Sequence, residues 1–102
     1  MANFELRYSP LFYDDLDKIT NYILLDLKNE IATIAFIYDI EAAIKKRLEN
    51  PLQATIYPSM RRRKYEYRRI LVGNYLVFYV VIERTMIVRR LLYGGRDLDK
   101  IL

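Results

Sequence analysis

The first hydrophobic pattern along the chain is a short alternation followed by a helical repeat. Between Asn3 and Tyr8 apolar and polar residues alternate, which places three apolar side chains on one face of a strand. Ser9 and Pro10 then supply an N-cap acceptor and a first helical residue whose missing N–H costs nothing. From there to about Lys28 apolar residues recur every three or four positions, so one face of a helix is continuously apolar. The residues on this face are Phe12, Leu16, Ile19, Ile23 and Leu27.

A second helical repeat follows with almost no linker. Asn29 is suited to cap this helix, and the Asn50-Pro51 step ends it. Its apolar positions again recur at spacings of three and four, at Ile34, Ile37, Ile40, Ile44 and Leu48. Two long helices joined so closely predict an antiparallel helical hairpin.

The second half of the chain has the pattern of a β-sheet. Residues 51–58 have no period and contain two prolines, so we interpret them as a crossover loop. Three runs rich in β-branched and aromatic residues follow, separated by short turns at Gly73-Asn74 and near Arg84-Thr85, and they predict a three-stranded antiparallel meander. The runs are Tyr67 to Val72, Tyr75 to Glu83 and Met86 to Tyr93. The middle run is apolar on both faces, which is typical of a central strand covered on each side.

The predicted elements combine into one α+β domain spanning residues 1–102. Their order is β-α-α-β-β-β, and a short helical turn from Asp97 to Leu102 completes the chain with Leu98, Ile101 and Leu102 turned inward. We expect the hairpin to pack on one face of a twisted, largely antiparallel sheet, and a basic surface to occupy the other. A chain of 102 residues with 53% hydrophobic content, three glycines and three prolines is rich enough in core formers to fold by itself.

The residue types that are missing restrict the chemistry. The sequence has no cysteine and no histidine, so it has no thiolate ligand, no cysteine nucleophile and no side chain that titrates near neutral pH. Asp14, Asp15 and Asp17 are interpreted as partners of a helix dipole and not as a metal site. We therefore expect no metal and no cofactor. The N-terminus lacks the pattern of a secretion signal, and no apolar run is long enough for a membrane span, which favours a cytoplasmic protein without membrane contact.

Charge divides the chain into two unequal halves. Up to Tyr57 there are 6 Lys and Arg against 9 Asp and Glu, and from Pro58 onward there are 11 against 4, which gives net charges of −3 and +7. A strongly basic half is typical of a protein that meets nucleic acid or an acidic partner. A solvated basic face is the alternative explanation.

The densest basic segment leads directly into the first strand of the meander. Residues 61–69 hold six positive charges and two tyrosines. Guanidinium groups fork onto phosphate oxygens and tyrosine rings offer stacking surfaces, so this mixture favours RNA or exposed DNA. The candidate target-binding residues here are Arg61, Arg62, Arg63, Lys64 and Arg68. The alternative is a solvated loop whose charges keep the edge of the sheet from pairing with another chain.

Further candidates lie on the strands. Arg89 and Arg90 are adjacent, so strand geometry predicts that they point to opposite faces. One of them would share the open face with an arginine of the first meander strand across the central strand, and such a cluster suits a scissile phosphate or an acidic partner. Tyr93 ends the last strand, where it would serve as a proton donor or stacking platform if exposed, or as a packing residue if buried.

Two sequence runs resemble the RelE/ParE toxin family. They are YRRILVGNYLVFYVV at 67–81 and IVRRLLYGGRD at 87–97, and the element order fits over nearly the whole chain. The resemblance implies a bacterial toxin of a type II toxin–antitoxin system, in which an antitoxin encoded beside the toxin neutralises it. It also implies that operator DNA is reached only through the toxin–antitoxin complex. ParE-like members poison DNA gyrase, whereas RelE-like members cleave mRNA on the ribosome.

The resemblance assigns roles to individual residues. A RelE-like nuclease would use Arg69 to stabilise the phosphate, Arg90 as a second phosphate ligand and Tyr93 as the acid, without a metal. Target contacts would extend to Arg89 and Arg96. The missing histidine, the Gly94-Gly95 pair and the long helical hairpin depart from that branch, so the ParE-like branch is slightly favoured. A non-toxic nucleic-acid-binding module is a further alternative.

The antitoxin implied by the family would be opposite in charge to the basic half of this chain. We expect an acidic ParD-like or RelB-like partner that folds as it wraps the toxin. An amphipathic helix of this partner would dock on the apolar ridge of the hairpin, or an acidic segment would cover the strand arginines. The candidate antitoxin-binding residues are Phe12, Leu16, Ile37, Ile44, Arg69 and Arg90.

Overall fold

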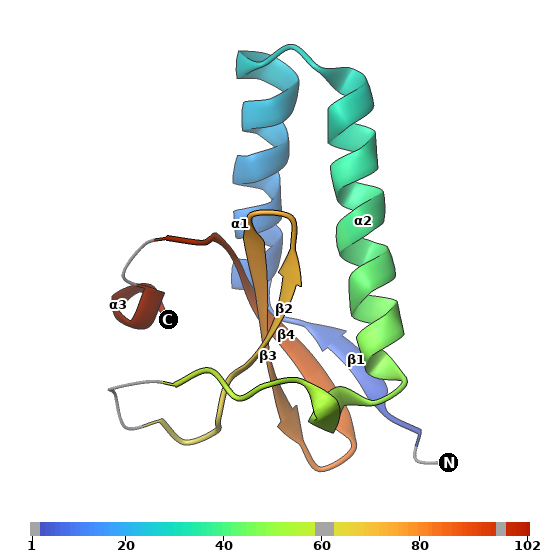
Figure 1. Ribbon diagram of the computed structural model, residues 1–102, viewed down its shortest axis with the longest axis vertical. Coiled ribbons are helices and arrows are strands. Elements are labelled where there is room, and N and C mark those ends of the chain that lie inside the picture. Colours follow the sequence, from blue (N-terminus) through green and yellow to red (C-terminus); the bar gives the residue numbers. More distant parts are fainter. Residues whose placement is uncertain (1–2, 59–62, 96–97) are drawn as a thin grey trace.

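A computed structural model describes residues 3–58, 63–95 and 98–102 and shows a helical hairpin standing on a β-sheet (Figure 1). In chain order the elements are β1 (Glu5–Tyr8), α1 (Pro10–Asn21), a π-helical turn (Tyr22–Asp26), α2 (Glu30–Leu48), a 3₁₀ turn (Pro51–Gln53), β2 (Arg68–Val72), β3 (Tyr75–Ile82), β4 (Thr85–Tyr93) and α3 (Leu98–Ile101). The predicted α+β order and the short C-terminal helical turn are thereby confirmed.

The sheet has the strand order β1-β4-β3-β2. Pairing of β2 with β3 and of β3 with β4 is antiparallel, so the predicted meander is confirmed. β1 lies parallel to β4, with Leu6 opposite Met86, and the sheet is therefore mixed. This arrangement differs from the predicted largely antiparallel sheet. Its cause is the long crossover through the hairpin, which returns the chain so that β4 enters between β1 and β3.

The two long helices begin and end by different means. Asn29 caps α2, because its Oδ1 accepts the N–H of Ala32 at 2.9 Å, as predicted. The predicted side-chain cap of α1 is wrong: Ser9 makes no such bond, and its carbonyl accepts the Phe12 N–H at 3.0 Å instead. The predicted helix to Lys28 also changes geometry after Asn21, where a π-helical turn begins.

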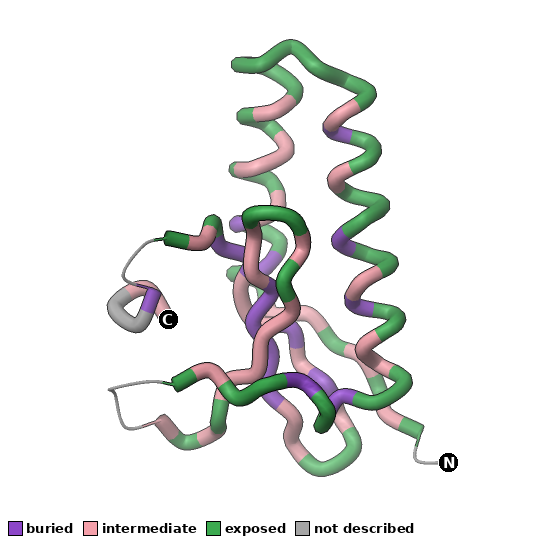
Figure 2. Tube along the Cα trace, viewed as in Figure 1, coloured by how far each residue is buried: buried purple, intermediate pink, exposed green. Residues whose placement is uncertain are grey.

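The main core lies between the helical hairpin and the sheet. Phe12, Ile40 and Ile44 from the helices are almost fully buried against one sheet face, which we call the helix face. The strand residues of this core alternate along β3 and β4, at Val77, Tyr79, Met86, Val88 and Leu91. Figure 2 shows that the upper parts of both helices, beyond the sheet, are mostly exposed.

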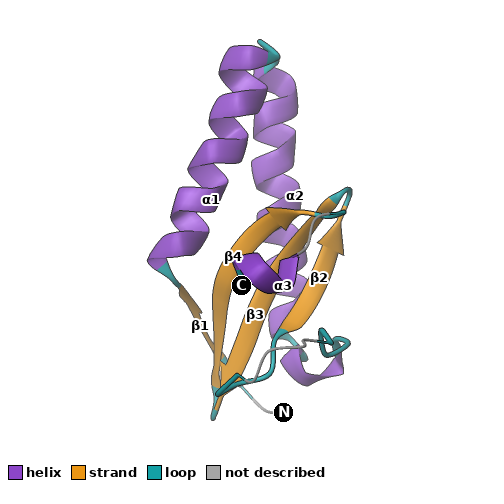
Figure 3. Cartoon of the chain, turned by 90° about the vertical axis from the view of Figure 1, so that its left-hand side faces the viewer, coloured by secondary structure: helices purple, strands orange, loops and turns teal. Residues whose placement is uncertain are grey.

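A smaller core covers the other side of the sheet, which we call the basic face. Phe78 is fully buried there with Leu92 and Leu98, so α3 covers part of this face (Figure 3). Tyr57 and Tyr67 pack around the same cluster. β3 is consequently buried on both faces, as its apolar sequence predicted. Within the described residues, no helix is long and apolar enough to cross a membrane.

Candidate functional site

A β-bulge changes the direction of the two adjacent arginines on β4. Phe78 pairs with Arg90, but Tyr79 pairs with Val88, so Arg89 is an extra residue in the ladder. The extra residue breaks the alternation of the strand. Arg89 and Arg90 both line one pocket with Tyr67, and the prediction that they point to opposite faces is therefore wrong.

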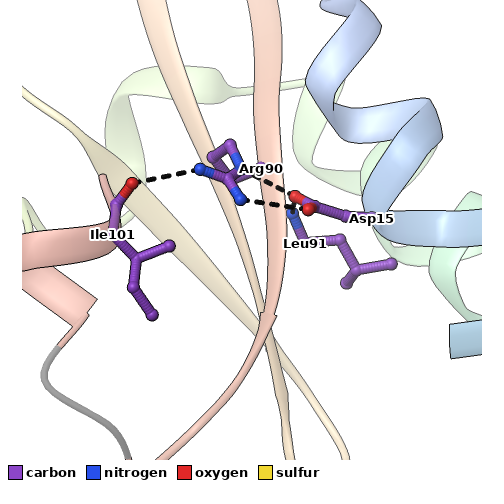
Figure 4. Close-up of polar contacts among 4 residues, drawn as sticks. All are labelled: Asp15, Arg90, Leu91 and Ile101. Carbon is purple, nitrogen blue, oxygen red and sulfur yellow. Dashed lines mark hydrogen bonds and ion pairs between the residues drawn. The ribbon is translucent and has the colours of Figure 1, made fainter. Parts of the chain in front are cut away.

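Arg90 is held in a buried ion pair with α1 (Figure 4). Its Nε donates to Asp15 Oδ2 at 2.7 Å and its Nη2 donates to Asp15 Oδ1 at 3.0 Å, while its Nη1 donates to the Ile101 carbonyl at 3.1 Å. The hydrogen bonds that Arg90 donates to the Asp15 carboxylate raise the pKa of Arg90 above its ordinary value. All three guanidinium nitrogens are engaged, so Arg90 ties α1, β4 and α3 together.

Asp15 is positioned by the end of the first strand. β1 stops at Tyr8, and the last main-chain bond on this edge of β4 runs from the Ser9 N–H to the Val88 carbonyl at 2.8 Å. Beyond it, the Leu91 N–H donates to Asp15 Oδ2 at 2.9 Å. The carboxylate thus replaces a missing strand partner, and the interpretation of Asp15 as a helix-dipole partner is corrected to a structural acceptor.

The sequence contained a signal for this buried acid. Asp15 lies three residues after Phe12 and four before Ile19, and therefore falls on the apolar face of the helix. A charged residue on a buried face needs a partner of opposite charge. Sequence reasoning missed it because the three neighbouring aspartates were interpreted as a group.

Arg69 shares a row of the sheet with Arg90. Arg69 pairs with Phe78, which pairs with Arg90, so both arginines lie on the basic face on either side of a buried ring. The prediction that a β2 arginine and a β4 arginine share one face across the central strand is confirmed. The Arg69 guanidinium lies above the Tyr57 ring at 5.4 Å from its centroid, within the range of a cation–π contact.

Arg68 lies away from this row. It pairs with Tyr79, whose side chain belongs to the helix-face core. Its Nη1 donates to the Ala54 carbonyl at 2.7 Å and to the Leu52 carbonyl at 3.2 Å. Arg68 therefore fixes the crossover loop and is not brought together with the other candidate target-binding residues.

A pocket of basic and aromatic residues lies beside the bulge. Its volume is about 370 Å³, and we call it the basic pocket; it is lined by Arg63, Lys64, Tyr65, Tyr67, Val80 and Arg89. Arg63 lies above the Tyr67 ring at 5.1 Å and Lys64 above the Tyr65 ring at 5.4 Å. The Arg89 Nε is buried and has no hydrogen-bond partner among the described residues. Arg61, Arg62 and Arg96 lie outside the described residues.

Tyr93 shares a pocket of about 400 Å³ with Arg90, although its position on the strand faces the other side of the sheet. It pairs with Tyr75 on the helix face, and the two rings meet edge to face with centroids 5.4 Å apart. Arg69 and Arg90 lie on the basic face. Of the three residues considered for RelE-like catalysis, Arg90 and Tyr93 therefore line a common pocket, and Arg69 is not among its lining residues.

An apolar groove runs between the helices on the helix face. It has a volume of about 390 Å³, and Phe12, Leu16, Ile37 and Ile44 all line it. We call it the hairpin groove. Phe12 and Ile44 form its floor, since they are 2% and 1% exposed, and Ile37 is 39% exposed at its rim. The four apolar residues considered for antitoxin binding thus share one surface, whereas Arg69 and Arg90 lie on the opposite face.

Within the part of the chain that the structure describes, no group of three or more acidic, histidine or cysteine side chains is arranged to hold a metal ion. The chemistry available to the basic pocket is that of guanidinium, ammonium and phenol groups. Such groups bind anions and stack on planar rings.

Comparison with known proteins places this arrangement in a family. A family model described as the ParE toxin of the type II toxin–antitoxin system, parDE, matches residues 6–98. No curated protein matches the sequence significantly.

Solved structures have the same fold. A chain from the chromosomal ParDE system of P. aeruginosa is 16% identical with a TM-score of 0.73, and the match covers 93% of this chain and 100% of that one. A chain of the RelB-RelE complex from Methanococcus jannaschii is 24% identical with a TM-score of 0.51, covering 85% and 88%. YafQ from E. coli is 10% identical with a TM-score of 0.53, covering 89% and 93%.

The fold and the family model together define a type II toxin of the RelE/ParE superfamily. Within that class, the chain belongs to the family of ParE toxins of the parDE toxin–antitoxin system.

Proposed function

We propose that this toxin arrests growth by binding DNA gyrase, as the ParE-like branch implies, and that an acidic antitoxin silences it. The observation that carries this choice is the position of the three candidate catalytic residues. Tyr93 shares a pocket with Arg90 but not with Arg69, and the nitrogens of Arg90 are already engaged with Asp15 and Ile101. A general acid must reach the reacting phosphate, so this arrangement favours a binding toxin over a nuclease.

The basic pocket is the proposed contact with the target. Its charge comes from Arg63, Lys64 and Arg89, and Arg61, Arg62 and Arg96 are further basic residues of the same half of the chain. Contiguous positive charges accelerate encounter with an acidic surface and hold it in register. Loss of this charge should weaken target binding while leaving the fold unchanged, because the main core lies on the other face.

A RelE-like ribosome-dependent mRNA endoribonuclease is the second candidate. The observation that favours it is the mixture of guanidinium and tyrosine groups in the basic pocket, with Arg63 stacked on Tyr67 and Lys64 near Tyr65. Such a mixture suits a phosphate and an unstacked base. In this case the RNA 2′-hydroxyl would attack the adjacent phosphate without a metal.

Two assays on the purified full chain separate the candidates. The first measures supercoiling of relaxed plasmid by gyrase, and the second measures cleavage of mRNA on translating ribosomes. We expect inhibited supercoiling with intact mRNA. Cleaved mRNA with unaffected supercoiling would assign the protein to the nuclease branch.

A pair of charge variants tests the role of the basic pocket in the same assays. Arg63→Gln with Lys64→Gln removes two charges from the pocket. Arg7→Gln with Lys18→Gln removes two charges from exposed positions in the acidic half and serves as the matched control. We expect a loss of at least about tenfold in potency for the first variant only. Equal losses of potency in the two variants would mean that only the net charge of the protein matters and that the basic pocket has no specific role.

The hairpin groove is the proposed binding site of the antitoxin. It is apolar, open between two helices and lined by Leu16 and Ile37 beside the buried Phe12 and Ile44, which suits an amphipathic helix. An acidic remainder of the antitoxin would reach the basic face of the sheet. Coexpression with the product of the neighbouring reading frame should restore growth and yield a complex that copurifies.

A further inference from the structure

Arg89 is a cation without a partner at the bulge of β4. It is the extra residue of the strand, and bulges often lie beside functional sites, where they redirect a side chain. Within residues 3–58, 63–95 and 98–102, no hydrogen bond or ion pair engages Arg89. Its Nε is buried, so this donor is also shielded from water. A buried donor without a partner needs an explanation, and in a cation the simplest one is a site for an anion.

The adjacent Arg90 shows what satisfies a guanidinium in this part of the sheet. Its Nε and Nη2 donate to the Asp15 carboxylate at 2.7 and 3.0 Å. Arg89 has no such carboxylate among the described residues. Removal of a charge from water usually offsets much of the gain from an ion pair. Because the fold already shields the Nε of Arg89, a carboxylate that binds its outer nitrogens meets less of this cost.

Arg89 lies between two pockets of different character. The basic pocket is one of them, and the other, which we call the α3 pocket, also has a volume of about 370 Å³. Tyr67 and Arg89 line both pockets, which therefore form one trough. In the α3 pocket the apolar lining comes from the start of α1, at Leu11, and from the end of the chain, at Ile101 and Leu102. The trough is cationic at one end and largely apolar at the other.

The two ends of the trough favour a protein segment over a nucleic acid. A nucleic-acid strand carries a negative charge at every phosphate and is bound through repeated positive charges. At the α3 end, the arginine beyond Arg89 is Arg90, and its guanidinium nitrogens are already engaged. A segment with an acidic side chain next to apolar side chains fits both ends. Its carboxylate would bind Arg89, and its apolar side chains would fill the α3 pocket.

We propose that the trough binds an acidic and apolar segment of the target protein, with Arg89 as the residue that anchors the carboxylate of this segment. The proposal rests on the proposed function, in which the basic pocket contacts the target. The occupant is the target because the antitoxin helix is assigned to the hairpin groove on the helix face, which leaves the trough open. An unpaired buried charge lowers stability, and proteins retain such costs where function needs them.

The two adjacent arginines give opposite expectations when each is replaced by methionine. For Arg89→Met we expect an unchanged or higher urea midpoint, because an unpaired charge is removed. The concentration that inhibits gyrase supercoiling should rise at least about tenfold. Arg90→Met should lower the midpoint, because Asp15 is left unpaired. If Arg89→Met lowers the midpoint as much as Arg90→Met, or inhibits gyrase as the wild type does, the proposal is overturned.

Arg84→Gln is the matched control for the loss of charge. Arg84 precedes β4 at its other end, lines neither pocket and donates its Nε to the Asn3 carbonyl at 3.2 Å. It should inhibit gyrase as the wild type does. If Arg84→Gln and Arg89→Met lose potency equally, the effect belongs to the net charge of the sheet half and Arg89 is not an anchor.

Labelled peptides test the chemistry of the segment without gyrase. The probes are short fluorescein-labelled peptides of glycine and serine that carry a pair of glutamates and a pair of leucines, in both orders, with glutamine counterparts. Fluorescence anisotropy with the full chain should show binding of a glutamate peptide, weakened at least about tenfold by glutamine or by Arg89→Met. Arg89→Lys keeps the charge but loses the planar fork, so it should retain part of the affinity. Absence of glutamate-peptide binding up to about 1 mM overturns the proposal.

The other possible occupants give distinct results. If a labelled single-stranded RNA binds through Arg89 and the glutamate peptides do not displace it, the trough is a nucleic-acid site. If Arg89→Met weakens antitoxin binding but inhibits gyrase normally, the anchor belongs to the antitoxin interface. Either result overturns the proposal. If the wild-type chain does not inhibit gyrase, the proposed function fails, and the peptide titration still decides whether Arg89 anchors a carboxylate.

Discussion

At the scale of single residues, the Asp15–Arg90 pair is the most consequential contact. Asp15 is 7% exposed, and its carboxylate accepts bonds from both Arg90 and the Leu91 N–H. A buried pair is costly to break because the remaining charge has no partner. The family resemblance implies a phosphate ligand or an antitoxin contact at Arg90, whereas its hydrogen bonds make it a residue that holds α1 and α3 on the sheet.

We therefore predict that Asp15→Ala lowers the free energy of unfolding by about 3 kcal/mol, within the range for breaking buried pairs. Urea denaturation followed by circular dichroism measures this loss. Glu41→Ala is the control, because the Glu41–Lys45 pair at 2.7 Å has side chains that are 55% and 65% exposed. Exposed pairs contribute at most about 1 kcal/mol. Equal losses for the two variants would contradict the structural role of Asp15.

Tyr79 provides a second prediction at this scale, which concerns alkaline pH. Its hydroxyl donates to the Pro51 carbonyl, and burial raises its pKa above the ordinary 10.0. As pH rises, the unfolded chain loses this proton first. The contribution of Tyr79 to stability is therefore complete below pH 10 and is lost as pH rises through the folded pKa.

The variant Tyr79→Phe tests both the hydrogen bond to Pro51 and the loss of the phenol proton at alkaline pH. The variant removes the hydrogen bond and leaves the Pro51 carbonyl without it, which costs about 1 to 3 kcal/mol at neutral pH. It should also reduce the fall in stability between pH 9 and pH 11, measured by urea denaturation at each pH. Part of the fall should remain, because burial raises the pKa of Tyr8 and Tyr75 as well. If the free energy of unfolding of the variant falls between pH 9 and pH 11 as much as that of the wild type, Tyr79 does not contribute to this fall.

At the scale of elements, a buried leucine anchors the C-terminal helix in addition to the bond from Arg90 to the Ile101 carbonyl. Leu98 is 5% exposed and packs with Phe78 and Leu92 on the basic face. Truncating a buried leucine removes apolar burial and leaves a cavity. Because α3 is a short terminal element that can close around the space, we predict that Leu98→Ala costs about 2 kcal/mol, at the low end of that range.

Leu71→Ala is the matched control for this measurement. Leu71 is 71% exposed on β2, so its truncation should stay within about 0.5 kcal/mol of wild type. A loss for Leu98→Ala no larger than for Leu71→Ala would mean that α3 contributes nothing to the stability of the sheet.

The hairpin groove carries the second prediction for elements. Ile37 lies at the rim of the groove and is 39% exposed, so a charge is tolerated there by the fold better than on the buried floor. Ile37→Glu should weaken antitoxin binding by at least about 2 kcal/mol, since a carboxylate would be buried without a partner in the complex. Titration calorimetry measures the change. Leu71→Glu places the same charge on an exposed site outside the groove and should bind normally.

At the scale of the whole molecule, the separation of charge sets how partners approach. The net charges of −3 and +7 follow from 6 basic against 9 acidic residues up to Tyr57 and from 11 against 4 beyond it. An acidic antitoxin should be drawn first to the sheet half and then settle into the apolar groove. Salt screens the first step, with a Debye length of about 10 Å at 0.1 M, and leaves apolar contacts largely unaffected.

We predict that the association rate with the antitoxin falls at least about tenfold between 0.05 M and 0.5 M NaCl, while the dissociation rate changes little. Stopped-flow fluorescence measures both rates. Replacing Arg61, Arg62, Arg63 and Lys64 by Gln should flatten the salt dependence. Equal salt slopes for the variant and the wild type would mean that residues 61–64 do not steer the partner.

The sequence by itself determined the elements of this protein. The spacing of apolar residues predicted both helices and the antiparallel meander, and Asn29 was predicted to cap α2. The two apolar faces of β3 predicted its central position, and the meander predicted that a β2 arginine and a β4 arginine share one face. These features are local or connect neighbours along the chain, so the period of the side chains suffices to specify them.

Only the tertiary structure decided how these elements combine into a site. β1 pairs with β4 across about 80 residues, and the bulge at Arg89 turns two adjacent arginines to one face. Asp15 finds Arg90 because β1 ends early and leaves an edge of β4 open. No local pattern records such pairings, because they are set by which surfaces meet once the hairpin packs on the sheet. For the same reason the side of the sheet on which Tyr93 lies became known only from the strand register, and its shared pocket with Arg90 became known only from the packing around β4.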